Sequence, residues 1–239
     1  MFFSDKGKEM ENKNLLYSCL ILVGLIGCDG SSTGVVSEEK PLISIASKGD
    51  SSFISEHFSG SQNCERCHNR LSDDAGEDVS IIKDWQATIM ANATRDPFWK
   101  AKVRTELNRT PKLAEVINDK CSKCHAPMAH FEASKASASI EILDNGFTNA
   151  DNPYHDAAME GVSCTLCHQI EDSETLGKPE GMSGHYPISN PSTRKLYGPY
   201  ENVFTEPMQR NVNYTPTFSA HVKESELCAT CHNLKTPFA

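Results

Sequence analysis

The segment Cys64-Glu65-Arg66-Cys67-His68 contains two cysteines separated by two residues, and a histidine follows them at once. The same C-x-x-C-H pattern begins again at Cys121, at Cys164 and at Cys228. We number these segments motifs 1 to 4 in chain order. The motifs contain the cysteines Cys64, Cys67, Cys121, Cys124, Cys164, Cys167, Cys228 and Cys231, and the histidines His68, His125, His168 and His232. Eight of the ten cysteines therefore follow one rule, and that rule governs the interpretation of the whole chain.

C-x-x-C-H is the attachment pattern of c-type haem. Two thiols on one turn can each add to a vinyl group of the same porphyrin, and the next residue places an imidazole at the iron as proximal ligand. Zinc ribbons and thioredoxin-like sites also use C-x-x-C. A zinc ribbon needs no histidine after each pair, and a redox motif is expected once, beside a βαβ pattern that is not visible here. The motifs therefore predict four covalently attached haem c groups, with the eight cysteines as attachment points and the four motif histidines as proximal iron ligands.

The composition supports a globular protein whose core is filled by more than aliphatic side chains. The chain has 239 residues, of which 38% are hydrophobic, and a formal net charge of −9. This acidic balance argues against binding to a phosphate backbone, so nucleic acid is not an expected partner. We predict a mainly α fold with long irregular loops, a multihaem cytochrome c fold organised around its covalent haems.

Local signals place several helices. Residues 84–94 are expected to form one helix. Asp96-Pro97 and Thr110-Pro111 each look like a helix start, with a capping residue before a proline, and the second helix is expected to run into Cys121. Residues 171–218 are rich in glycine, proline and small polar residues and are predicted to form loops, and no strand alternation is visible.

The N-terminal segment predicts export and attachment to a membrane. Lysines precede an apolar run, Leu15 to Gly27, that is too short to span a bilayer and has the form of a secretory signal. The run ends in Leu25-Ile26-Gly27-Cys28, which is similar to a bacterial lipobox with Cys28 as the lipidated residue. The predicted organisation is a signal peptide at 1–27, a flexible tether at 28–52 and a tetrahaem domain at 53–239, for which one interpretation is C-terminal truncation. The expected location is the cell envelope, on the periplasmic side or the outer surface, with a lipid anchor.

The distal ligands decide whether each iron is closed or open to a substrate. The candidates outside the motifs are His57, His155, His185, His221 and Met90, with His130 as a weak candidate because it follows His125 by only five residues. His57-x6-Cys64 and His221-x6-Cys228 echo each other and indicate a repeated haem-binding hairpin. Each of these two histidines is expected to cap a neighbouring haem, which brings haems into close pairs.

Three segments resemble multihaem c-type cytochromes related to the tetrahaem cytochrome c family of nitrifying bacteria. They are Trp85-Gln86-Ala87-Thr88-Ile89-Met90, Gly161-Val162-Ser163-Cys164-Thr165-Leu166-Cys167-His168 and Glu226-Leu227-Cys228-Ala229-Thr230-Cys231-His232-Asn233. In that family a W-x-x-S-x-H segment supplies a distal histidine. Here Met90 stands at the histidine position, so the resemblance implies that Met90 either caps one iron or leaves it open.

Three functions are consistent with these features. The first is electron transfer by a membrane-tethered tetrahaem cytochrome, with redox proteins or a quinol-oxidising membrane complex as partners. The second is a haem enzyme with one open iron that acts on a small nitrogen or sulfur compound. The third is a subunit of a cytochrome filament or membrane redox complex, which makes the protein part of an oligomer. All four proximal ligands are histidine, which favours the electron carrier.

Overall fold

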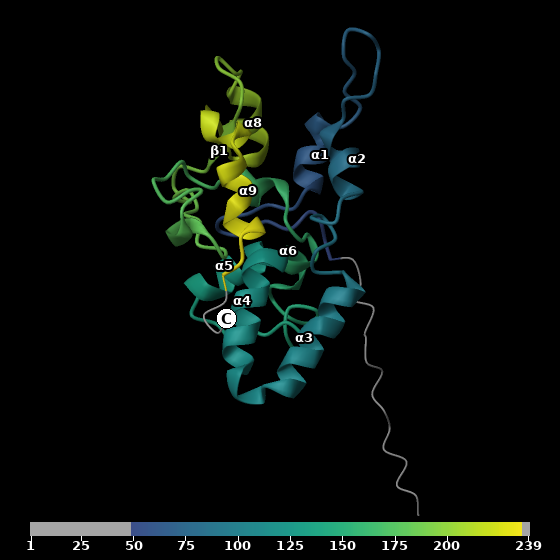
Figure 1. Cartoon of the computed structure of the whole chain (residues 1–239). Helices are drawn as coiled ribbons and strands as arrows, with labels where there is room; N and C mark the ends of the chain where they lie inside the picture. The colour runs from purple at the N-terminus through teal and green to yellow at the C-terminus, as the bar shows by residue number, and fades with distance from the viewer. Residues whose placement is uncertain (1–48, 236–239) are drawn as a thin grey trace, which may run out of the picture. The chain divides into compact units, whose positions relative to one another are not determined.

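The computed structural model describes residues 49–235, and helices dominate this part of the chain (Figure 1). The α-helices are α1 (Gln62–His68), α2 (Ile81–Gln86), α3 (Pro97–Arg109), α4 (Ala114–His125), α5 (Pro127–Lys135), α6 (His155–Met159), α7 (Cys164–Cys167), α8 (Glu206–Val212) and α9 (Ser225–His232). Three 3-10 turns, η1 (Pro111–Leu113), η2 (Pro179–Gly181) and η3 (Ala220–Lys223), and two strands, β1 (Lys195–Gly198) and β2 (Thr215–Phe218), complete the described elements. The predicted mainly α class is confirmed.

The two proline-marked helix starts are also confirmed. Asp96 precedes α3 and its carboxylate accepts the backbone N–H of Phe98, which satisfies one of the free donors at the helix start. Pro111 opens the turn η1, which leads directly into α4. Because α4 ends at His125, motif 2 forms the last turns of this helix.

The helix predicted at 84–94 is wrong in its extent. Helix α2 ends at Gln86, and the chain continues in turns through residue 95. The hydroxyl of Thr88 donates to the carbonyl of Trp85, and the side-chain amide of Asn92 donates to the carbonyl of Gln86. These carbonyl groups are the acceptors that another helical turn would use, so polar side chains compete with the helix and end it.

The prediction of loops over residues 171–218 is wrong in part, because this range contains β1, α8 and β2. Strands β1 and β2 pair in parallel, with Lys195 opposite Thr215 and Gly198 opposite Phe218. Each strand has four residues and the pair is only partly buried, so neither strand carries the alternating pattern by which a strand is found in sequence.

The apolar core lies where α5 packs against α6. Its buried members are Phe58, Ala126, Met128, Ala129, Ala133, Phe147, Ala157, Ala158, Met159 and Leu166. Ala126 directly follows motif 2, and Leu166 lies inside motif 3. The core therefore fixes the ends of two motif helices.

The predicted signal peptide, Cys28 and most of the predicted tether lie outside the described residues. The described part begins at Gly49, and the backbone N–H of Asp50 donates to the carboxylate of Asp156 at 2.9 Å. Among the residues from 49 to 235, no helix is both long and apolar enough to cross a membrane.

Candidate haem-attachment site

Each C-x-x-C-H motif coincides with the end of a helix. Motifs 1, 2 and 4 form the last turns of α1, α4 and α9, and motif 3 is the short helix α7 with His168 as its C-cap. Residues three apart on a helix lie on the same face. The two cysteines of every motif therefore share a face, which is the arrangement that two bonds to one porphyrin require.

The fold brings alternate motifs together in pairs. The thiol of Cys64 in motif 1 lies beside that of Cys164 in motif 3, and this neighbour together with burial raises the pKa of Cys64. The thiol of Cys124 in motif 2 likewise lies beside that of Cys231 in motif 4, which lowers the pKa of Cys124 and raises that of Cys231. Burial and the nearby thiols raise the pKa of Cys167 to about 12. The structure thus contains a motif 1–motif 3 pair and a motif 2–motif 4 pair.

A short segment, residues 57–61, ties motif 1 to motif 3, and we call it the first clamp. The hydroxyl of Thr165, inside motif 3, donates to the carbonyl of Ser59 at 2.9 Å and accepts the N–H of Ser59 at 3.2 Å. The amide of Gln169 donates to the carbonyl of His57 at 2.9 Å. The buried carboxylate of Glu160 accepts the N–H of Ser61, which caps the helix of motif 1.

A second clamp, residues 183–186, ties motif 2 to motif 4. The hydroxyl of Tyr186 donates to the carbonyl of Lys123 inside motif 2, at 3.1 Å. The N–H of Gly184 donates to the carbonyl of Thr230 inside motif 4, at 2.8 Å. Gly184 has a φ of +79°, and a Cβ there would lie 2.7 Å from the Cβ of Lys123. Only glycine gives the second clamp this close approach to motif 2.

Three histidines have the hydrogen bond that orients an imidazole for metal binding. The Nδ1 atoms of His155, His168 and His185 lie 3.0, 2.6 and 2.7 Å from the carbonyl oxygens of Phe147, Tyr197 and Met182, respectively. A carbonyl oxygen can only accept, so each Nδ1 carries the proton and each Nε2 has a free lone pair. This is the tautomer in which imidazole binds a metal through Nε2.

The other candidate ligands have different surroundings. In His221 both ring nitrogens are engaged, Nδ1 by Ser219 at 2.7 Å and Nε2 by the carbonyl of Ile170 at 2.8 Å. His130 directs Nε2 at the carboxylate of Asp119, at 2.9 Å. Nδ1 of His57 lies 3.1 Å from the carboxylate of Glu132.

The segment that contains Met90 lies beside motif 3. The indole N–H of Trp85 donates to the carbonyl of Val162, and the N–H of Val162 donates to the carbonyl of Met90, both at 2.9 Å. The side chain of Met90 is 44% exposed.

Besides the shared face of the motif cysteines, the structure contains two histidines with buried ring nitrogens that have no hydrogen-bond partner within the described residues. These atoms are Nδ1 of His125 in motif 2 and Nε2 of His155. Only Nε2 of His155 is an atom through which the imidazole would bind iron, since its Nδ1 already donates to a carbonyl oxygen. A buried polar atom without a partner is costly, so Nε2 of His155 fits a place beside a bound iron. In addition, no residue of α1 is buried, so the helix of motif 1 has no apolar face in the described core.

Sequence reasoning missed the residues that build the clamps, because none of them is an invariant residue of C-x-x-C-H. Thr165 and Lys123 occupy variable positions of C-x-x-C-H, and Gln169 carries only the weak signal that it follows a proximal histidine. Their role comes from contacts between segments 63 to 112 residues apart.

The family described as cytochrome c554 and c-prime matches residues 63–169, a range that contains motifs 1 to 3. Motif 4 lies beyond the matched range. No curated protein matches the chain, and no solved structure does. The family match supports a c-type cytochrome with covalent haem c and a general role in haem-based electron transfer.

Proposed function

We propose that this protein is a tetrahaem c-type cytochrome that carries single electrons between redox partners. The observation that carries the proposal is the pairing of motif 1 with motif 3 and of motif 2 with motif 4 through the hydrogen bonds of the two clamps. When bound, haem c supplies one-electron chemistry at its iron, and attachment sites this close suit passage of an electron from one site to the next.

In this proposal the chain's residues hold and enclose the cofactors. The eight motif cysteines form the covalent attachment, and the four motif histidines are proximal ligands. His155 and His185 supply distal nitrogens, since their Nδ1 atoms already donate to carbonyl oxygens. Two axial histidines leave an iron with no free position for a substrate, which favours an electron carrier over an enzyme.

A haem enzyme is the second candidate, and one observation favours it. Among the described histidines outside the motifs, His130 and His221 direct Nε2 at protein oxygens, which leaves His57, His155 and His185 for four irons. The fourth iron is then capped by Met90 or is open. The oxidised spectrum separates these outcomes, because an open ferric iron is high spin and a capped one is low spin.

Intact mass after expression with the haem-attachment machinery tests the haem count. We expect the mass to exceed that of the polypeptide by four haem units. A double variant, Cys228→Ala with Cys231→Ala, is expected to carry three units and to retain the haems of motifs 1 to 3. A surplus of two or three units in the unaltered protein would contradict the proposal.

We further propose that Cys28 is lipidated and that the protein faces its redox partners from a membrane surface of the cell envelope. The support is the lipobox-like sequence that ends at Cys28. A single acyl chain anchors only marginally, so the modification must add more than one chain. Cys28→Ala is expected to release the protein from membranes, or to block its processing, without loss of haem. A variant that still fractionates with membranes at unchanged mass would refute lipidation.

A further inference from the structure

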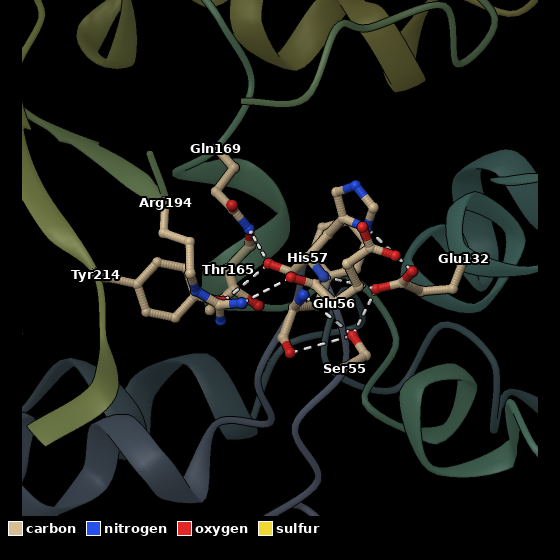
Figure 2. A network of polar contacts seen from close by, with 9 residues as sticks. Ser55, Glu56, His57, Glu132, Thr165, Gln169, Arg194 and Tyr214 are labelled. Carbon is tan, nitrogen blue, oxygen red and sulfur yellow. Dashed lines mark hydrogen bonds and ion pairs between the residues drawn. The ribbon is translucent and has the colours of Figure 1, made fainter. Parts of the chain in front are cut away.

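A buried carboxylate holds the histidine of the first clamp. Glu132 lies on α5 and is 9% exposed. Its Oε1 accepts the hydroxyl of Ser55 at 2.6 Å and the backbone N–H of His57 at 2.9 Å, and its Oε2 lies 3.1 Å from Nδ1 of His57. Figure 2 shows Glu132 approaching His57 and Ser55 from one side, while Gln169, Arg194 and Tyr214 approach from the other.

These contacts determine the charge and the tautomer of the pair. The hydroxyl of Ser55 and the backbone N–H of His57 both donate to Glu132, which suits an ionised carboxylate, and opposite an ionised carboxylate Nδ1 of His57 carries the proton. No hydrogen bond within residues 49–235 engages Nε2 of His57. Its lone pair is therefore available to a metal.

A divalent ion bound by Glu132 and its neighbours explains the buried charge less well than hydrogen bonds do. Glu56, His57 and Glu132 each offer a ligand atom within 4.8 Å of the others. However, both oxygens of Glu132 already accept hydrogen bonds, and Glu56 is exposed. Hydrogen bonds alone account for the buried charge, and an ion would have to displace them.

The backbone on the other side of His57 is fixed to motif 3. Its carbonyl accepts the side-chain amide of Gln169 and the hydroxyl of Tyr214, both at 2.9 Å. Gln169 directly follows the proximal ligand of motif 3, and the first clamp runs on into the helix of motif 1. His57 is thus held between a buried carboxylate and the motif 1–motif 3 pair.

We infer that Glu132 is a positioning residue for an iron of the motif 1–motif 3 pair, which it orients and tunes through His57 as the distal ligand. A carboxylate that accepts from Nδ1–H increases the electron donation of the imidazole more than a carbonyl does, and second-shell partners of this kind tune a metal. Stronger donation favours ferric iron. This haem should therefore have a lower midpoint potential than haems whose axial histidines donate Nδ1–H to a carbonyl oxygen. The inference rests on the proposed function, because it requires haem in motifs 1 and 3.

The test uses the haem-loaded full chain with Glu132→Gln, which keeps the size of the side chain and removes its charge. We expect one midpoint potential to rise and one low-spin ferric signal in the electron paramagnetic resonance spectrum to change its g values. Glu160→Gln is the matched control, because Glu160 is 4% exposed and bonds the N–H of Ser61 and the hydroxyl of Ser163 but no imidazole. The control removes the same charge near the same pair and should leave the g values unchanged.

Ser55→Ala is a second variant, with an expected effect of opposite sign. It removes one donor from Glu132, leaves the carboxylate more basic toward Nδ1, and should lower the same potential. The inference is overturned if Glu132→Gln and Glu160→Gln shift the potentials equally with unaltered g values, or if Glu132→Gln shifts nothing. A protein that holds four haems and yet gives either result would refute the role of Glu132 and leave the proposed function standing.

Discussion

The first clamp makes a quantitative prediction for Thr165→Val, a change that keeps the shape of the side chain and removes its hydroxyl. Thr165 and Ser59 are both buried, and the hydroxyl serves the N–H and the carbonyl of Ser59 together. Valine leaves both groups buried and unpaired, at about 1–3 kcal/mol each, so we expect a loss of about 3 kcal/mol in the free energy of unfolding. For a domain of this size, the melting temperature should fall by about 6–12 °C.

Thr230→Val is the matched control, since Thr230 lies between the cysteines of motif 4 as Thr165 does in motif 3. Its hydroxyl is buried and has no hydrogen-bond partner within the described residues. Its removal should be neutral or should stabilise the protein by up to about 1 kcal/mol. Thermal unfolding followed by far-ultraviolet circular dichroism, on samples of equal haem content, compares the two variants. Equal melting temperatures would refute the reasoning that the first clamp depends on this hydroxyl.

Three further predictions concern other parts of the motif surroundings. Gly161→Ala should destabilise the protein by about 2–3 kcal/mol in denaturant unfolding, since Gly161 has a φ of +61° and a Cβ would lie 2.5 Å from the carbonyl oxygen of Met90; an unchanged midpoint would contradict this. Although burial opposes ionisation of Asp119, its hydrogen bonds to His130 and Lys123 lower its pKa below 3.8. Asp119→Asn should therefore cost about 1 kcal/mol near neutral pH, and the difference should vanish as the pH falls well below 3.8, so a deficit that persists in acid would exclude this cause. Met90→His should lower one haem potential in a redox titration and leave the others nearly unchanged, because imidazole favours ferric iron more than a thioether does; no change in any potential would assign Met90 to packing.

The chemistry of each attachment site was predictable from sequence because that chemistry is local. Two thiols and an imidazole within five residues form a complete unit on a single helical turn, and no distant residue is needed to recognise it. The starts of α3 and α4 were predictable for the same reason, since capping acts between neighbours. The end of α2 was missed because Thr88 and Asn92 compete for its carbonyl groups through side-chain hydrogen bonds that periodicity does not register.

The sequence by itself therefore determined that this chain carries C-x-x-C-H units in a mainly helical protein. Which motif meets which was decided by the tertiary structure alone. The first clamp meets motif 3 across a separation of 106 residues between Ser59 and Thr165, and no local pattern encodes that contact. The carboxylate on His57 likewise comes from a helix 75 residues away. An imidazole has the same sequence signature whether its Nδ1 meets a carbonyl, a carboxylate or nothing, and only the packing of distant segments supplies the partner that sets its properties.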